Sequence, residues 1–460
     1  MIMSNIKSKN QFDEKIIFEV KKIFDELFPI CRSITGNGVR QSLKILQKIA
    51  NFDIKEIPSG TSCYDWIIPN EWNVEEAYIE DSLGNKIIDF KKNNLHLVGY
   101  SVPIDENISF NELKSHLHML PDLPDAIPYR TSYYEKNWGF CLSKKQFEQL
   151  DPNESYHVKI KSKLEQGSLT YGEYYIKGKS SKEYIFSTYC CHPSLANDNL
   201  SGMVLWALLL RELQNRETEN SYRFVIAPET IGAIAYLSEN EKAMKNVTGG
   251  FILMTVAGPG KFSYKESFLQ EHEVDVVTRK AFQKLKTDFI SYPFHILGGD
   301  ETEFSSPYFR IPIGVVCKDK YYEYDYYHTS LDNLEFISPQ NLIDVFDIYI
   351  KIIDQLEKNQ TYISLNPQGE PMLGKRDLYP QTGGAIHQRV VNSKKSHEER
   401  EYPTTSKTMK GTELDAMLWL LFYGDGENSL LEIEGKTNIP LETLHSVATT
   451  LCKKNLLKMK

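Results

Sequence analysis

The middle of this 460-residue chain alternates short apolar runs with longer amphipathic ones, and this alternation constrains the fold more than any other feature. Runs rich in β-branched and aromatic residues, such as EYIFSTYCC, YRFVIAP and GGFILMTVAG, are followed by helical patterns such as SGMVLWALLLRELQ and NLIDVFDIYIKIIDQLEK. Strands and helices that alternate in this way are typical of a mixed or parallel sheet covered by helices. The sequence therefore predicts an α/β fold over roughly residues 168–360.

The flanking regions have different patterns and indicate further domains. Residues 13–50 have apolar positions at helical spacing on both sides of a break at CRSITGNG. The region that follows has short alternating stretches separated by Pro, Asn and Gly, which favours β-structure. The predicted parts are an α/β domain of residues 1–55 and 166–365, a β-rich insert of 56–165, a linker or wrapping segment of 366–410, and a winged helix-turn-helix of 411–460.

Composition argues against several classes of protein. The formal net charge of -9 does not favour nucleic acid binding by the chain as a whole. No apolar run is long enough to span a membrane, and the first residues do not resemble a secretion signal. The seven cysteines lack CxxC spacing, which indicates reduced thiols. We therefore expect a soluble cytoplasmic protein that has no membrane partner.

Polar residues with catalytic potential follow the predicted strands. His192 comes directly after EYIFSTYCC, and Asp198 follows six residues later, where a helix should begin. Glu229 ends YRFVIAP in the same way, and His328 lies in the later motif YYHTSLDNL. Ligands of α/β sheets gather at the carboxyl ends of strands. The sequence predicts a metal site of His192, Asp198 and His328, with Glu229 as the general base that hydrolysis at zinc requires.

Each of these residues also has a purely structural explanation. Asp198 alone is compatible with a helix N-cap, and Glu229 with an acid in the first turn of a helix, where it favours the helix dipole. A single histidine at a strand end is more often structural than metal-binding. The order of the four residues and their shared position after strands favour the metal site over four unrelated roles.

Four motifs resemble those of the two-zinc exopeptidases of the bacterial leucyl aminopeptidase type. HPSLANDNLSG is similar to their first histidine and bridging aspartate, ETIG to their catalytic glutamate turn, GGDETEF to their Ser-Asp-His-containing loop, and YHTSLDNL to their last histidine motif. The resemblance implies that His192 and His328 are terminal metal ligands. It also implies that Asp198 is the bridging carboxylate and Glu229 the general base.

Nearly the whole chain resembles a bacterial family described as polysaccharide-biosynthesis proteins with an aminopeptidase-like domain. The motifs that carry this resemblance are LFPICRSITGNGVRQSL, YDWIIPNEW, PYRTSYYEKNWGFC, CCHPSLANDNLSG, YHTSLDNL and GEPMLGKRDLYP. The resemblance implies a zinc-exopeptidase-like mixed sheet flanked by helices, a β-rich inserted subdomain and a C-terminal winged helix. It also associates the chain with surface-polysaccharide biosynthesis.

Two positions depart from the two-zinc pattern. Thr230 stands where the exopeptidases have a second glutamate, and Thr255 or a neighbour stands where they have an aspartate. A dinuclear site needs several anionic ligands. We therefore expect one zinc ion per chain, held by His192, Asp198 and His328 with an open position for water. Metal-binding imidazoles are usually oriented by acidic residues that do not touch the metal themselves. The candidates for such a supporting role are Asp300, Glu301 and Asp332.

Two functions from different classes fit these observations. The first is a zinc-dependent aminopeptidase-like hydrolase that cleaves an amide next to a free amine, in a small peptide-like or amino-sugar substrate. The alternative is a catalytically silent binding protein with a structural or vestigial metal site. Retention of Glu229 favours the enzyme, because a binding module does not need a general base. Loss of two carboxylates favours the silent protein. The aromatics of YRTSYYEKNWGF are candidates to line the mouth of the site.

The C-terminal segment has the pattern of a winged helix but not the charge of a DNA reader. Its second helix, LETLHSVATTL, contains an acid and neither Arg nor Lys for contacts with phosphate or guanine. Nucleic acid is therefore not an expected partner. Packing, partner docking or formation of a homo-oligomer is the expected role.

Overall fold

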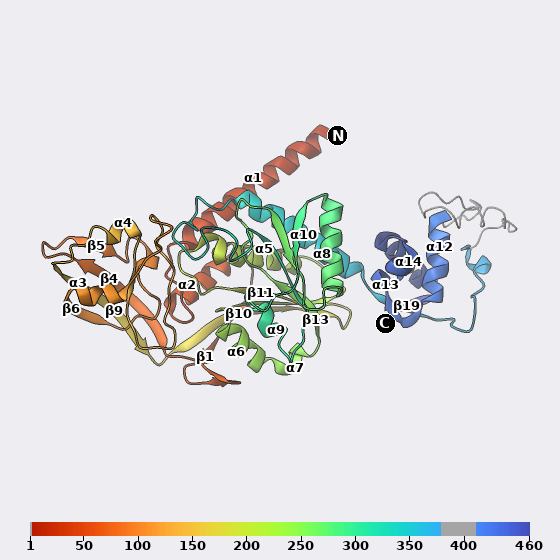
Figure 1. The fold of residues 1–460 in the computed structure, drawn as a ribbon. Helices are drawn as coiled ribbons and strands as arrows, with labels where there is room; N and C mark the ends of the chain where they lie inside the picture. The colour runs from red at the N-terminus through yellow and green to blue at the C-terminus, as the bar shows by residue number, and fades with distance from the viewer. Residues whose placement is uncertain (1, 379–410) are drawn as a thin grey trace. The chain divides into compact units, whose positions relative to one another are not determined.

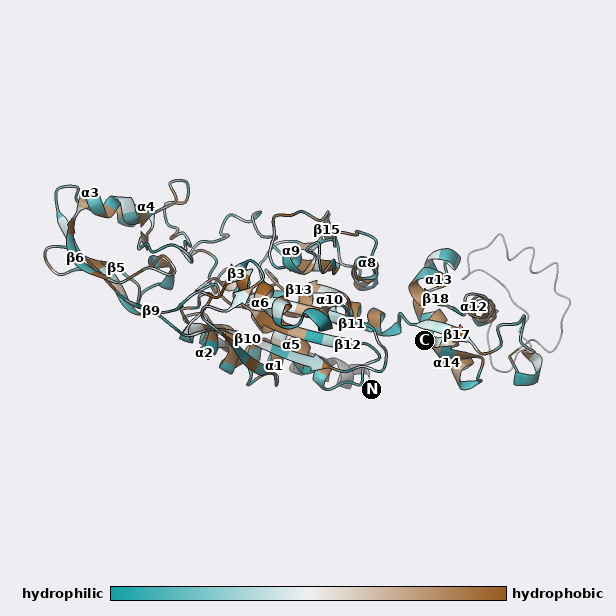
Figure 2. Cartoon of the chain, turned by 90° about the horizontal axis from the view of Figure 1, so that it is seen from below, coloured by the Kyte–Doolittle hydropathy of each residue, from teal (hydrophilic) through white to brown (hydrophobic). Residues whose placement is uncertain are grey.

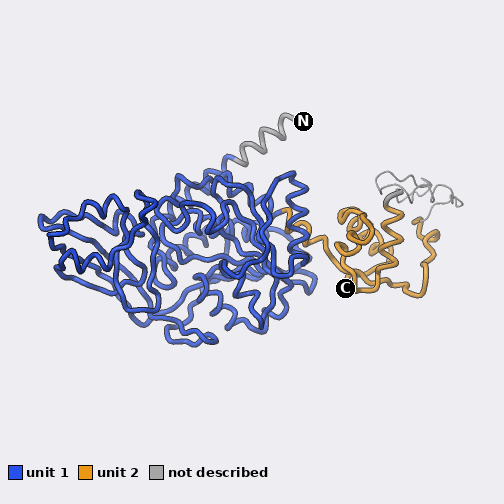
Figure 3. Tube along the Cα trace, viewed as in Figure 1, with its two compact units in different colours: residues 1–350 blue, residues 351–460 orange. Residues whose placement is uncertain are grey.

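The structure is a computed structural model that describes residues 2–378 and 411–460. It forms two compact units, Met1–Ile350 and Lys351–Lys460 (Figure 3). Most of the linker predicted at residues 366–410 lies outside the described residues. Among the described residues, no helix combines the length and the apolar character needed to cross a membrane.

Unit 1 is organised around an eight-stranded sheet with the order β1-β10-β12-β11-β13-β16-β14-β15 (Figure 1). The central pairs β12/β11, β11/β13 and β13/β16 are parallel, whereas β1/β10, β10/β12 and β14/β16 are antiparallel. The predicted α/β fold with a mixed sheet is therefore confirmed. The strands are β1 (Asp53–Pro58), β10 (Ser168–Ile176), β11 (Glu183–Tyr189), β12 (Ser221–Ala227), β13 (Val247–Ile252), β14 (Phe262–Lys265), β15 (Phe289–Tyr292) and β16 (Ile313–Lys318).

Apolar contacts between the strands and the surrounding helices form the core of unit 1. All seven residues of β11 are buried, as expected for a central strand of a sheet covered on both faces. The Phe186 ring in this strand stacks on Phe224 and Phe251, with centroids 5.3 and 5.5 Å away. Figure 2 shows hydrophobic residues concentrated where the sheet meets its helices. These helices are α1 (Ile2–Leu27), α2 (Asn37–Leu46), α5 (Gly202–Gln214), α6 (Ile231–Glu239), α7 (Glu241–Met244), α8 (Glu273–Leu285), α9 (Glu301–Phe304) and α10 (Pro339–Lys358).

The β-rich insert contains a four-stranded antiparallel sheet with the order β5-β4-β9-β6. Its strands are β4 (Glu71–Glu80), β5 (Lys86–Asp89), β6 (Ile104–Ser109) and β9 (Ser155–Glu165), with the short helices α3 (Phe110–Leu113) and α4 (Lys144–Phe147). Arg40 of α2 joins this sheet to the main one. It forms two hydrogen bonds of 2.7 and 2.6 Å with Glu71 and an ion pair of 2.6 Å with Glu56 of β1.

Unit 2 has the helix and strand order expected of a winged helix. Helices α12 (Gly411–Phe422), α13 (Leu430–Thr437) and α14 (Leu441–Lys453) accompany a three-stranded sheet of β17 (Thr361–Ser364), β18 (Asp425–Ser429) and β19 (Leu457–Met459). Ser429 caps α13 in a capping box with Glu432. Because β17 pairs with β18 and β19, this unit starts before residue 365, where the sequence boundary of the α/β domain was set.

Candidate metal centre

The four residues singled out in the sequence lie together at the carboxyl edge of the main sheet. His192 follows β11, and Glu229 follows β12, which is parallel to it. Asp198 lies in the tight turn η3 (Ala196–Ser201) that precedes α5, and His328 lies in the loop between β16 and α10. The ligand atoms of His192, Asp198 and His328 are all within 4.8 Å of one another.

The geometry of this cluster is compact. His328 Nε2 lies 2.9 Å from Asp198 Oδ2, and the two imidazole centroids are 5.3 Å apart. Glu229 Oε2 is 3.8 Å from His192 Nε2. Asp198 is fully buried, whereas the side chains of His328 and Glu229 are 30 % and 28 % exposed. The site therefore combines a buried carboxylate with a side that is open to a ligand.

Two buried atoms of the cluster, Asp198 Oδ2 and His328 Nε2, face each other at 2.9 Å. Within the described part of the chain, neither atom forms a hydrogen bond with any third group. A cation between them and His192 would satisfy both atoms. Two imidazole nitrogens and one carboxylate oxygen are a donor set that zinc prefers. The residues present therefore fit a zinc ion.

Asp198 is oriented by its surroundings and does not cap a helix. Its backbone angles, φ -111 and ψ 87, are not helical, and the residue before α5 is Ser201. Tyr189 donates its hydroxyl hydrogen bond to Asp198 Oδ1. Asp332 accepts hydrogen bonds from the backbone N–H groups of Asn197 and Asp198, at 2.6 and 3.0 Å. Asp332 thus holds the turn that carries Asp198.

His192 is fixed by two neighbours that the sequence did not indicate. Its Nδ1 lies 3.3 Å from Cys191 Sγ, which also accepts the backbone N–H of Glu229 at 3.3 Å. Arg32 donates from Nε to the His192 carbonyl at 3.0 Å. Burial lowers the pKa of His192 to about 4. The imidazole is therefore neutral near pH 7, which is the form that binds metals.

Asp300 and Glu301 have roles other than the expected contact with an imidazole. Asp300 Oδ1 accepts the backbone N–H of Thr230 at 2.7 Å and so holds the turn after Glu229, where Thr230 has φ 60. Glu301 Oε1 binds Lys265 Nζ at 2.6 Å. Among the described residues, no hydrogen bond joins either carboxylate to His192 or His328.

Carboxyl groups near the site disfavour the charged form of Glu229. Burial raises the pKa of Glu229 well above its usual range, and the carboxylates of Asp300 and Asp198 add to this effect. Burial also raises the pKa of Asp300 to about 8, against the opposing hydrogen bond from Thr230. A bound cation would offset this accumulation of negative charge.

The ion pair between Lys265 and Glu301 gives a stability prediction. Both side chains are essentially inaccessible to solvent, at 1 % and 0 % exposure. Lys265→Met leaves the Glu301 carboxylate buried without its cation, and we expect the free energy of unfolding in urea to fall by about 3–5 kcal/mol. The exposed Lys261→Met is the matched control. If Lys265→Met changes stability no more than this control, or if adding Glu301→Leu does not recover stability, the ion pair is not the cause.

The insert contributes an aromatic residue that sequence reasoning placed only at the mouth of the site. Tyr129 donates its backbone N–H to the His328 carbonyl at 2.8 Å, so this segment is hydrogen-bonded to the loop that carries His328. The Tyr129 ring lies 5.1 and 5.2 Å from the His192 and His328 rings. Its hydroxyl is hydrogen-bonded to that of Tyr133 at 2.7 Å. The motif YRTSYYEKNWGF was the available signal, because it contains both tyrosines.

Comparisons with known proteins connect the fold to a family. Residues 21–359 match the model of a domain of unknown function, DUF4910, and residues 401–459 match a winged helix-turn-helix. The chain is 42% identical over 441 residues to a protein of Clostridium acetobutylicum, with 96% of both chains covered. That protein is provisionally described as a polysaccharide biosynthesis protein with an aminopeptidase-like domain.

Solved structures support the same fold. A crystal structure of a provisionally named peptidase from Clostridium acetobutylicum is 40% identical, covers 100% of both chains and has a TM-score of 0.81. BSAP, a zinc aminopeptidase from Bacillus subtilis, is 15% identical with a TM-score of 0.55, over 75% of this chain and 94% of that one. A peptidase M28 precursor from Shewanella amazonensis is 12% identical with a TM-score of 0.51, over 77% and 96%.

These two distant structures share the fold of unit 1, including the sheet whose carboxyl edge carries the site. The two clostridial sequences extend the likeness over almost the entire chain. The chain therefore belongs to the family of bacterial polysaccharide-biosynthesis proteins with an aminopeptidase-like domain, and its residues 21–359 are a member of DUF4910.

Proposed function

We propose that the chain is a zinc-dependent aminopeptidase-like hydrolase that cleaves an amide next to a free amine, in a peptide-like or amino-sugar intermediate of surface-polysaccharide biosynthesis. The observation that carries the proposal is the convergence of the ligand atoms of His192, Asp198 and His328 within 4.8 Å of one another, beside Glu229. The polysaccharide context comes from the name of the clostridial relative. The free state of all seven cysteines supports a cytoplasmic location.

One zinc ion, held by His192, Asp198 and His328, fits the residues better than two. A bound zinc ion supplies Lewis acidity that activates a carbonyl group and a water molecule for hydrolysis. Only Asp198 contributes an anionic ligand atom to the three-residue cluster. Thr230, and Thr255 or a neighbour, stand at the two positions where the two-zinc exopeptidases have carboxylates, so a second dication would lack the two carboxylates that those enzymes supply.

Glu229 is suited to move the proton that hydrolysis releases. Its carboxylate lies beside the candidate metal ligands, 3.8 Å from His192 Nε2, where a general base for the attacking water is needed. A carboxylate oxygen of Glu229 takes a proton from the water that attacks the amide carbon. As the C–N bond breaks, the same oxygen returns the proton to the leaving nitrogen. One water is consumed, and a carboxylic acid and an amine are formed.

Metal-dependent turnover of amides tests this function. The wild-type protein is incubated with aminoacyl amides and amino-sugar amides, with and without a zinc chelator, and amine release is measured. We expect amine release that the chelator abolishes and added zinc restores. If no amide is cleaved by protein that contains zinc, the alternative of a silent binding protein with a vestigial site replaces the hydrolase. The two threonines in place of carboxylates favour that second candidate.

Asp332 gives a prediction about metal affinity. Asp332 accepts the Asn197 N–H with Oδ1 and the Asp198 N–H with Oδ2, and Asp332→Asn turns one of these oxygens into an amide nitrogen and leaves the other uncharged. We expect the zinc dissociation constant, measured by competition with a chelator, to rise by about 10–100-fold. The exposed Asp325→Asn in the same loop is the control. Unchanged affinity in Asp332→Asn would mean that the turn holds Asp198 without this carboxylate.

A further inference from the structure

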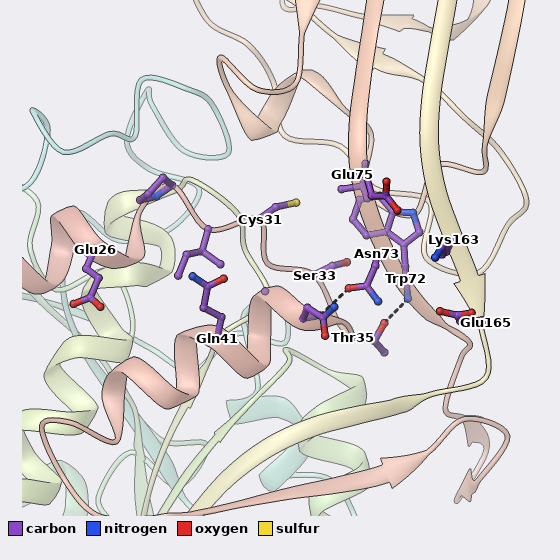
Figure 4. A pocket seen from close by; sticks show the side chains of 15 residues that line it. Glu26, Cys31, Ser33, Thr35, Gln41, Trp72, Asn73, Glu75, Lys163 and Glu165 are labelled. Atoms are coloured by element: carbon purple, nitrogen blue, oxygen red, sulfur yellow. Dashed lines mark hydrogen bonds between the residues drawn. The ribbon is translucent and has the colours of Figure 1, made fainter.

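A cavity lies between the first two helices and the insert, apart from the candidate metal centre (Figure 4). Its volume is about 540 Å³, within the range of about 300–1,000 Å³ typical of small-molecule pockets. Figure 4 shows side chains of the segment 26–41 on one side and side chains of β4 and β9 on the other. The metal-centre residues are not part of this lining.

Hydrogen bonds between its walls fix the shape of this cavity. Thr35 Oγ1 is hydrogen-bonded to the Tyr100 hydroxyl at 2.6 Å and accepts a hydrogen bond from the backbone N–H of Trp72 at 3.0 Å. Asn73 Oδ1 accepts the backbone N–H of Asn37 at 2.8 Å. These bonds join the helical segment to β4, so the cavity does not depend on a loop that moves independently of the sheet.

Polar side chains without partners face the space between the walls. Ser33 and Gln41 on the helical side, and Lys163 and Glu165 of β9, have no side-chain hydrogen bond or ion pair within the described part of the chain. They offer a hydroxyl, an amide, an ammonium and a carboxylate. Together these groups can donate and accept several hydrogen bonds.

The charge of the lining limits what can bind. Three of its side chains are carboxylates, those of Glu26, Glu75 and Glu165, and Lys163 is the one cation. Lysines outside the lining pair with two of these carboxylates, Lys48 with Glu26 at 2.8 Å and Lys161 with Glu75 at 2.5 Å. Glu165 and Lys163 are left, and their charges balance. A lining without excess charge does not compensate a charged ligand for its lost hydration, so it favours neutral ligands.

The cavity adjoins the metal centre without opening into it. Cys31, Ser33 and Trp72 also line a narrow space that reaches Tyr129 and Pro193. The volume of this space is about 10 Å³, room for about one water molecule. A ligand in the large cavity therefore lies close to the metal-site loops but is not positioned for cleavage.

We propose that this cavity is a saccharide-binding site for one or two neutral sugar units, separate from the hydrolytic centre. Sugar hydroxyls both donate and accept hydrogen bonds, which matches the free hydroxyl, amide and carboxylate of Ser33, Gln41 and Glu165. The site would hold the protein on a glycan while the metal centre acts elsewhere on the same or a neighbouring molecule.

Titration of the full-length protein with simple sugars tests the proposal. The probes are glucose, galactose and N-acetylglucosamine, with glucosamine and glucuronate as the cationic and anionic counterparts, and binding is followed by saturation-transfer NMR. We expect at least one neutral sugar to bind, and glucosamine and glucuronate to bind more weakly. Gln41→Ala and Glu165→Ala should each weaken binding by about five- to tenfold, as for loss of one hydrogen bond.

Matched variants and a catalytic variant separate the possible outcomes. Gln149→Ala and Glu148→Ala, exposed on the insert away from the cavity, should bind sugar like the wild type. Glu229→Gln should bind it equally, so a failure of the hydrolase proposal leaves this one testable. No binding of any of the three neutral sugars overturns the proposal. Binding that Gln41→Ala and Glu165→Ala leave unchanged, or that is strongest for glucosamine or glucuronate, overturns it as well.

Discussion

Glu229→Gln is expected to lower kcat/KM for amide hydrolysis by about 10²–10⁴-fold while zinc remains bound. Glutamine has nearly the same shape as glutamate but cannot take a proton from water. The Glu229 carboxylate lies 3.8 Å from His192 Nε2 and does not belong to the cluster formed by the ligand atoms of His192, Asp198 and His328. Activity and zinc content are measured on the same preparation, so that loss of catalysis is distinguished from loss of metal.

The exposed Glu335→Gln, in the loop that follows His328, is the matched control and should retain full activity. Retention of most of the activity by Glu229→Gln would show that another group moves the proton. Loss of zinc together with activity would instead make Glu229 a ligand, which is a different site from the one proposed.

Asp198→Asn is expected to remove zinc from the protein. The substitution keeps the size of the side chain but removes the only anionic ligand atom of the three-residue cluster. We expect the dissociation constant to rise by more than about 100-fold, because loss of an outer partner alone has effects up to that size. Zinc added at about 100 times its wild-type dissociation constant should stabilise the wild type by about 2.7 kcal/mol and the variant by much less.

His192→Ala should behave in the same way, and His118→Ala, an exposed histidine of the insert, should keep both the zinc content and the stabilisation. Stoichiometric zinc in Asp198→Asn and in His192→Ala would mean that the metal binds elsewhere in the chain.

The part of the fold that the sequence predicts well is the part where local pattern and burial agree. EYIFSTYCC is apolar without alternation, and its strand β11 is buried on both faces in the centre of the sheet. SGMVLWALLLRELQ likewise forms α5. The insert was predicted only as β-rich. The pairing of its strands depends on contacts between residues far apart in sequence, which periodicity does not contain.

The sequence predicts the position of those site residues that directly follow a strand. His192 and Glu229 follow adjacent parallel strands, and parallel strands end at the same edge, so their proximity follows from the pattern. The motif YRTSYYEKNWGF indicated only that aromatics of the insert could line the mouth of the site, because the contact of Tyr129 with both histidine rings arises from tertiary docking of the insert. Asp300 contacts the Thr230 backbone instead of an imidazole, a distinction that spacing within a loop does not encode.

Anomalous diffraction from crystals of the wild-type protein grown with zinc tests the central claim most directly. The account predicts a single zinc peak per chain, surrounded by His192, Asp198 and His328. No peak at these residues would contradict the metal site itself, and two neighbouring peaks would contradict the single ion.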